Sequence, residues 1–333
     1  MDLALVYLLL MAVGILFYVL LDGFSLGVGI VSPWLSKGEE KALALKSLSH
    51  LWDSNQTWLV FGGVVLFVAF PRVYAAWLST LYLPVILMLI ALIFRGVAFE
   101  FYFKATTSRK WWDLSFTIGS SLAALCQGII VGAVVEHIYL PEQSTGDYWL
   151  SPFSVLTGLA LVSGYGLLGA CWLIRKCDNT AQQKMRWLAQ RALFLTLIGL
   201  AGVCFWVLFD FDAIAARWLS PAVGPWLLPV PILTLFVSYR LWRAIRMPSR
   251  NLSQDLVPLG WAMLLFVCAF IGLGAGLFPY IGPERLTFWE AVAPDASLTF
   301  SLFGIVLFLP MVIAYNIYNY RVFSGKTSLQ DGY

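Results

Sequence analysis

The stretch His50–Phe70, HLWDSNQTWLVFGGVVLFVAF, decides the class of fold. From Leu59 onward it is an apolar run of the kind that enters a lipid bilayer. The residues just before this run include an acid, Asp53, and two amides, Asn55 and Gln56. Ionisable side chains are costly within a bilayer, so their place at the start of an apolar helix indicates a function or a compensating partner.

The composition of the whole chain agrees with a bilayer environment. Of the 333 residues, 60% are hydrophobic and 12% are charged, and the mean hydropathy is +0.82. Soluble domains carry about 25% charged residues, and one soluble core cannot bury this much apolar surface. The sequence therefore predicts an all-α polytopic membrane protein. It predicts no cleaved signal peptide, because the first apolar run is long and leads directly into further spans. With a net charge of +3 and basic residues scattered over loops, it predicts no nucleic-acid partner.

Nine segments are candidates for transmembrane helices, since a span needs about 20 apolar residues. They are 4–30, 43–70, 74–102, 113–136, 152–175, 191–210, 225–246, 258–280 and 298–321. The connections between them are short. We therefore expect a single transmembrane domain over residues 1–333, without a separate domain for soluble catalysis.

The basic residues predict the orientation, because Lys and Arg are retained on the cytoplasmic side. Seventeen of the 21 Lys and Arg residues follow odd-numbered spans, three (Arg72, Arg217 and Arg285) follow even-numbered spans, and Arg95 lies within a span. This distribution predicts an N-terminus outside the cytoplasm and a C-terminus inside it.

Two glycine-rich stretches resemble each other. LLDGFSLGVGI (20–30) and SGYGLLGACWLI (163–174) are four spans apart, an offset that preserves orientation. The chain therefore contains either two similar four-helix units or two unrelated glycine-rich helices, and the sequence leaves both interpretations open.

Four ionisable residues within the predicted spans stand out: Asp22, Asp53, Arg95 and Glu100. The alternating directions of spans 1, 2 and 3, with span 2 starting near residue 43, predict that Asp22, Asp53 and Arg95 lie at a similar depth in the cytoplasmic part of the bilayer. Two acids and one base at one depth predict mutual compensation around Arg95.

This constellation allows two interpretations. It is either a buried ion pair that fixes the register of the helices, or part of a path for protons or ions. Ser25, Asn55 and Gln56 favour the path, because hydroxyl and amide groups can order water beside a carboxylate.

The histidines and cysteines do not indicate a metal site. His50 and His137 are predicted on opposite sides of the membrane, so they cannot hold one haem between them; a haem site with His50 as single ligand stays open. The five cysteines lie mostly in apolar runs without a C-x-x-C pair, and we interpret them as reduced core residues. The sequence has no nucleotide-binding or hydrolase motif.

Several stretches together resemble subunit II of the cytochrome bd quinol oxidases, most closely the cyanide-insensitive branch. They are LLDGFSLGVGI (20–30), HLWDSNQTWLV (50–60), FPRVYAAWLSTLYLPVILMLIALIFRGVAFEF (70–101) and WEAVAPDASLTFSLFGIVLFLPMVIAYNIYNY (289–320). The likeness covers most of the chain and is strongest over 18–104, where D-G-F-x-L-G-x-G, W-D-x-N-Q-x-W and F-R-x-x-x-F-[ED] occur in order. It implies nine transmembrane helices, arranged as two four-helix bundles (1–140 and 150–282) and one additional helix (296–322).

The resemblance also implies a function. Complexes of this family, in the bacterial inner membrane, oxidise quinol and reduce dioxygen to water. They generate a proton-motive force without pumping, and subunit I holds haem b and haem d. Subunit II is implied to bind no haem through its own side chains, to support assembly of subunit I, and to line a cytoplasmic proton path, for which Asp53 matches the usual acid and Asp22 and Arg95 match its neighbours. Some relatives hold a structural quinone in this subunit or add a small single-helix third subunit, and the sequence assigns residues to neither.

Two positions depart from the family pattern. The second acid of D-G-F-D-L-G is Ser25 here, and the glycine of W-D-G-N is Ser54. A serine can hydrogen-bond water but cannot store a proton at neutral pH, so the number of acids on the path is open.

Two competing functions remain alongside the oxidase subunit. A secondary transporter could use Asp22, Asp53 and Arg95 for coupling, although no pair of Gly/Pro-broken spans occupies matching positions in two inverted halves. A scaffold subunit would have no transport role. Haem absorption that appears only in a complex would favour the oxidase, whereas substrate binding by the lone protein would favour the transporter.

Overall fold

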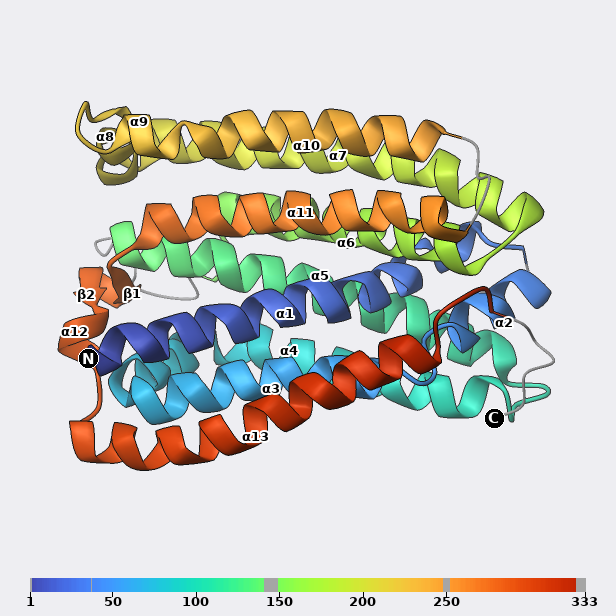
Figure 1. Ribbon diagram of the computed structural model, residues 1–333, viewed down its shortest axis with the longest axis horizontal. Coiled ribbons are helices and arrows are strands. Elements are labelled where there is room, and N and C mark those ends of the chain that lie inside the picture. The colour runs from blue at the N-terminus through green and yellow to red at the C-terminus, as the bar shows by residue number, and fades with distance from the viewer. Residues whose placement is uncertain (1, 37, 141–148, 248–251, 328–333) are drawn as a thin grey trace.

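The computed structural model describes residues 2–36, 38–140, 149–247 and 252–327. The long helices run side by side along the longest axis of the molecule (Figure 1). The first part of the chain forms α1 (Leu3–Val31), the 3-10 turn η1 (Ser32–Trp34), α2 (Glu39–Lys46), α3 (Trp52–Ala69), α4 (Pro71–Tyr102) and α5 (Arg109–Tyr139). The second part forms α6 (Pro152–Lys176), α7 (Asn179–Asp210), α8 (Asp212–Leu219), α9 (Gly224–Leu227), α10 (Pro229–Arg246) and α11 (Leu252–Leu277).

A small antiparallel hairpin connects α11 to the last long helix. It consists of β1 (Tyr280–Gly282), the turn η3 (Pro283–Arg285) and β2 (Leu286–Thr287), and it is followed by α12 (Phe288–Ala291) and α13 (Asp295–Val322). The indole nitrogen of Trp77 on α4 donates a hydrogen bond to the carbonyl of Ile281, at 2.8 Å. The hairpin is thereby attached to the end of α4.

The all-helical membrane fold is confirmed, although the predicted spans 43–70 and 225–246 are each divided between two helices, α2 and α3, and α9 and α10. Within the described part of the chain, seven helices are long and apolar enough to cross a membrane: α1, α4, α5, α6, α7, α11 and α13. An eighth span results if α8 and the segment Gly224–Arg246, which meet at a bend of 90°, are taken together. Helix α3 is not among these seven, because Asp53, Asn55 and Gln56 in its first turns lower its mean hydropathy. The count of nine spans therefore stays a prediction.

We expected the second span to be one continuous helix from residue 43 to residue 70, but the structure divides it into two helices. Helix α2 ends at Lys46 and α3 begins at Trp52. Between them, the hydroxyls of Ser47 and Ser49 donate hydrogen bonds to the carbonyls of Ala44 and Lys46, at 2.7 and 3.0 Å. Such bonds compete with the backbone for helical carbonyls and favour helix ends. Asp53 consequently lies in the first turn of α3, and not deep within a longer helix.

Helix α7 begins well before its predicted start near residue 191. In the added segment, Ala181, Met185 and Leu188 are buried at helical spacing, Gln183 is exposed, and Arg186 pairs with Asp255 of α11. This packing stabilises an extension of the helix that its hydropathy alone does not predict.

The helices pack both with neighbours in the chain and with distant ones. Helix α1 contacts α3, α5 and α6; α4 packs along α5, α6 along α7, and α10 along α11, which also contacts α6. Helix α13 lies against α3 on the outside of the molecule (Figure 1). Helices α1 and α6 therefore lie at the centre, where the first four long helices meet the next four.

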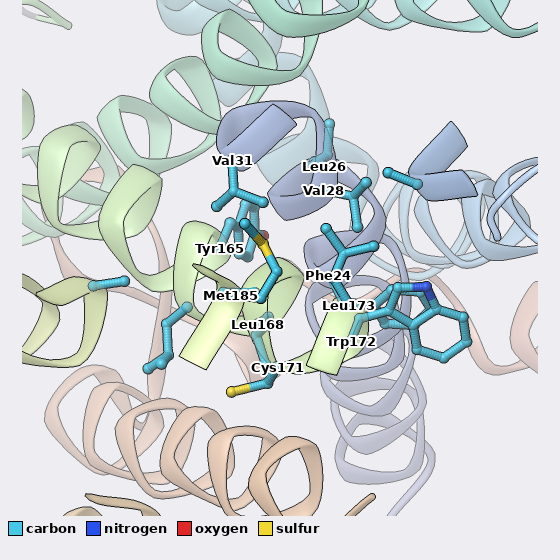
Figure 2. Packing of buried hydrophobic residues seen from close by; sticks show 14 of the residues in the cluster. Phe24, Leu26, Val28, Val31, Tyr165, Leu168, Cys171, Trp172, Leu173 and Met185 are labelled. Carbon is cyan, nitrogen blue, oxygen red and sulfur yellow. The ribbon is translucent and has the colours of Figure 1, made fainter. Parts of the chain in front are cut away.

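The contact between α1 and α6 brings together the two similar glycine-rich stretches. A methyl group added to Gly27 would lie 1.8 Å from the carbonyl oxygen of Tyr165, and one added to Gly169 would lie 2.1 Å from the carbonyl carbon of Gly27. Figure 2 shows the side chains of Phe24, Leu26, Val28, Leu168, Cys171 and Trp172 packed around this crossing, with Met185 of α7 beside them. The two stretches are thus packing partners, and their origin by duplication stays open.

Candidate functional site

Asp22 on α1 and Arg95 on α4 form an ion pair that is completely buried, with both side chains 0% exposed. Arg95 Nη2 donates to Asp22 Oδ1 at 2.9 Å, and Nη1 donates to Oδ2 at 3.2 Å. This two-point arrangement is the strong, directional form of an arginine–carboxylate pair. The prediction of mutual compensation around Arg95 holds for Asp22.

Ser25 completes this buried cluster. Its hydroxyl donates to Asp22 Oδ1 at 2.5 Å and accepts from Arg95 Nη2 at 2.5 Å. Ser25 lies one turn after Asp22 on α1, so it closes a three-membered network between two helices. Arg95 Nε is buried and has no hydrogen-bond partner among the described residues, which leaves one donor free to bind a water molecule or another acceptor.

Asn55 connects the start of α3 to this cluster. Its side chain is buried, and Nδ2 donates to the carbonyl of Leu21, the residue before Asp22, at 2.9 Å. Its Oδ1 accepts from the hydroxyl of Tyr320 on α13, at 2.8 Å. One amide therefore joins three helices beside the ion pair, and it places the first turn of α3 at the depth of Asp22.

Asp53 lies at that depth but faces away from the pair. Asp53 is exposed, as are Thr57, Val60 and Val64, which follow it on the same face of α3. Among the described residues, none lies close enough to Asp53 to form an ion pair. The expectation that Asp53 shares the charge compensation of Arg95 is wrong, because the rotation of α3 turns its carboxylate outward.

Glu100 and Gln56 differ from the buried cluster as well. Glu100 has a side chain that is 64% exposed and pairs with Lys104 at 3.5 Å, one turn further along α4. The expectation that Glu100 is part of a buried constellation is therefore wrong. Gln56 is half-buried, and its Nε2 is buried without a hydrogen-bond partner in the described part of the chain.

A second buried polar group, which sequence reasoning missed, lies next to the ion pair. Gln127 on α5 donates to the hydroxyl of Tyr18 on α1 at 2.7 Å and accepts from the hydroxyl of Tyr165 on α6 at 2.9 Å. Tyr18 lies one turn before Asp22. The signal was a single glutamine in the apolar run of α5, which could have been read like the acids.

The two histidines lie at opposite ends of the molecule. His50, in the turn between α2 and α3, stacks on Phe323 with ring centres 4.2 Å apart. His137, near the end of α5, has its Nδ1 2.8 Å from the carbonyl of Ala133. Within the described ranges, no three His, Cys, Asp or Glu side chains are grouped as metal ligands. The expectation that this chain ligates no haem stays a prediction.

The fold and the site define a helical, multi-pass membrane protein with an ion pair sealed between two helices and an acid on an outward face. The chain belongs to the family described as cytochrome bd terminal oxidase subunit II, which matches residues 3–323. The resemblance found in the sequence motifs is confirmed at the level of the family, while the cyanide-insensitive branch stays a prediction.

Individual relatives agree over nearly the whole length. The chain is 26% identical to cytochrome bd-I ubiquinol oxidase subunit 2 of Escherichia coli (strain K12), covering 97% of this chain and 94% of the relative. It is also 26% identical to cytochrome bd ubiquinol oxidase subunit 2 of Bacillus subtilis (strain 168), covering 97% and 96%. The structure of bd oxidase from Geobacillus thermodenitrificans contains a chain of the same fold, with a TM-score of 0.76 at 16% identity over 97% of this chain and 99% of that one.

Proposed function

We propose that this chain is the non-haem subunit II of a quinol:dioxygen oxidoreductase in a bacterial inner membrane. It supports assembly of subunit I, which holds haem b and haem d, and it lines a cytoplasmic proton path with the Asp53 carboxylate on the outward face of α3, while Asp22, Ser25 and Arg95 form the buried cluster beside this path. The proposal includes nine spans, as two four-helix bundles and α13, with a periplasmic N-terminus and a cytoplasmic C-terminus. Family membership, shown by the match over residues 3–323, supports it.

The observation that carries the proposal is the exposed carboxylate of Asp53 on a membrane helix. An acid that faced lipid there would be strongly disfavoured, so this face of α3 requires a polar or protein neighbour. Beyond Thr57 the face is apolar, with Val60 64% and Val64 53% exposed. A partner protein with its own helices fits such a face, and subunit I is the partner that the family provides.

The chemistry of the complex explains why an acid is needed at this position. Reduction of dioxygen to water consumes protons at a buried haem, and hydrocarbon conducts none. Asp53 can take up and release protons, Asn55 holds the first turn of α3 against α1, and Ser25 presents a hydroxyl between the two charges of the pair. If protons come from the cytoplasm while quinol releases its protons outside, turnover generates a proton-motive force without a pump.

The substitution Asp53→Asn tests this role. Asparagine keeps the shape but cannot titrate, so we expect quinol oxidase turnover to fall tenfold or more, which is about 1.4 kcal/mol or more on the limiting barrier. Because the Asp53 carboxylate makes no ion pair among the described residues, haem content and yield of the complex should stay close to those of the unchanged protein. Oxygen consumption and haem spectra of the purified complex are the measurements.

The matched control is Glu39→Gln, which removes an exposed acid in the first turn of α2 and should leave turnover unchanged. Full activity of Asp53→Asn at normal haem content would contradict the proton path and favour a scaffold subunit without a transport role. If the isolated chain instead bound and moved a substrate without any haem-bearing partner, the transporter would replace the oxidase subunit.

A further inference from the structure

A groove opens between α7 and α10, away from the ion pair and the exposed face of α3. Its volume is about 800 Å³, and its lining includes Arg191, Phe194, Leu195 and Leu197 of α7 and Ser238 and Trp242 of α10. Helix α10 packs mainly along α11 and touches α7 less closely, which leaves this space between two neighbouring helices at the edge of the molecule (Figure 1).

The surroundings of the groove are basic and contain aromatic rings. Arg191 lies over the ring of Trp187 at 3.7 Å, and Arg246 lies over that of Trp242 at 4.3 Å. Arg240 lies over the ring of Trp261 on α11, at 5.0 Å, so it faces α11 and not the groove. The only acid of α7 and α10 is Asp210, at the far end of α7.

In the described part of the chain, the arginines near the groove have no acidic partner, whereas the neighbouring Arg186 has one. Arg186 pairs with Asp255 of α11 at 3.1 Å. Among the described residues, no ion pair involves Arg191, Arg240, Arg243 or Arg246. The positive charge at this end of the groove is therefore uncompensated within the described part of the protein.

We infer that the groove binds one anionic phospholipid, with its phosphate at Arg191 and an acyl chain along Phe194, Leu195 and Leu197. Basic pockets between transmembrane helices recognise anionic headgroups, and the planar guanidinium matches phosphate oxygens with two hydrogen bonds. The apolar wall below Arg191 suits an acyl chain, which a free phosphate ion does not have. A neutral quinone would fill the wall but leave the charge uncompensated. With the predicted orientation, the lipid belongs to the cytoplasmic leaflet.

Photo-crosslinking of the purified complex tests this site. Phosphatidylglycerol with a photoactivatable acyl chain should label peptides that contain 193–197 and 238–242 more strongly than the phosphatidylethanolamine analogue. Removal of one cation near an anionic headgroup costs about 1 kcal/mol, so Arg191→Gln should lower phosphatidylglycerol labelling about fivefold. It should lower phosphatidylethanolamine labelling less, because the ammonium group of that headgroup already balances its phosphate. Lys110→Gln, which removes an exposed charge from the start of α5, should change neither.

A second variant addresses the acyl chain alone. Leu195 lines the groove and is 55% exposed, so Leu195→Trp should fill the space and lower labelling by both lipids. Equal labelling by the two lipids, or a phosphatidylglycerol signal that survives Arg191→Gln, would overturn the inference. Preferential labelling by a photoactivatable ubiquinone would also overturn it, in favour of a quinone.

Discussion

At the scale of single residues, two acids at one depth have opposite surroundings. Asp22 is sealed against Arg95 and Ser25, whereas Asp53 faces outward. The sequence predicted that the three ionisable groups lie at one level along the helices, but not which acid pairs with Arg95. A soluble helix shows its buried face by the period of its apolar residues, but a membrane helix is apolar on all sides, so its rotation is not written in that pattern.

The buried pair predicts a strong dependence of stability on charge balance. Asp22→Asn leaves Arg95 buried without a counter-charge, which costs roughly 3–5 kcal/mol. The double variant Asp22→Asn/Arg95→Gln removes both charges, so it should be more stable than the single variant although it carries one more substitution. The melting temperature and yield of the purified complex measure both.

A double-mutant cycle completed with Arg95→Gln gives the coupling between the two residues. If the loss of stability in the double variant equalled the sum of the losses in the two single variants, the residues would act independently. That outcome would contradict the two hydrogen bonds between them.

We expect replacement of the two histidines to leave haem binding unchanged. The ring of His50 stacks on Phe323, and Nδ1 of His137 is close to the carbonyl of Ala133. Replacement of both by glutamine should therefore leave every haem band in the absorption spectrum of the complex. The specific loss of one haem from an otherwise assembled complex would instead identify a ligand in this chain, with His50 the first candidate.

At the scale of elements, hydropathy located the long helices but missed local packing. The turn between α2 and α3 has no Pro or Gly to mark it, and it depends on serine hydroxyls that bind helical carbonyls. Helix α13 has so few buried residues that its place depends on polar contacts near its ends: Tyr7 donates to the carbonyl of Leu298 at 2.7 Å, and Tyr320 donates to Asn55. Such pairings join distant parts of the chain, so no local pattern predicts them.

The crossing of α1 and α6 makes a prediction about helix packing. A methyl group at Gly27 would collide with the backbone of α6, 1.8 Å from a carbonyl oxygen, so Gly27→Ala must separate the two helices. Overpacking of this kind costs typically about 1–3 kcal/mol, and we expect a lower melting temperature of the complex. Gly260→Ala on α11 is the control, because a methyl group there meets no atom within 4 Å. Equal stability of the two variants would contradict the close approach.

At the scale of the whole molecule, one end carries several ion pairs that join distant helices. Lys184 of α7 pairs with Glu40 of α2 at 2.9 Å, and Lys326, beyond α13, pairs with Asp255 of α11 at 3.0 Å. These charges lie on the side that the excess of Lys and Arg predicts to be cytoplasmic. The sequence predicted the side by counting charges, but the pairing of the charges depends on the helices that meet there.

The orientation leads to a labelling prediction. Thr180 and Ala222 are exposed at opposite ends of the long helices, Thr180 at the start of α7 and Ala222 between α8 and α9. The same orientation predicts that position 144, in the loop 142–147, faces the periplasm, but that loop lies outside the described residues, so Ala222 serves as the periplasmic probe. In a Cys204→Ala background, which removes the one exposed cysteine of the five, Ala222→Cys should react with a membrane-impermeant thiol reagent in intact spheroplasts. Thr180→Cys should react only after the membrane is opened.

The labelling result also determines the side of the membrane toward which Asp53 and the groove lie. With the predicted labelling, Asp53 lies toward the cytoplasm, and the proton path that we propose would draw protons from the side where their uptake adds to the proton-motive force. The reverse labelling would place Asp53 toward the periplasm, where uptake would cancel the protons that quinol releases on that side, and the arginine-lined groove would then face the outer leaflet. Because the α3 face and the groove both lie toward the end that carries Thr180, a single inversion would change both proposals together, while the Asp22–Arg95 pair would stay as it is.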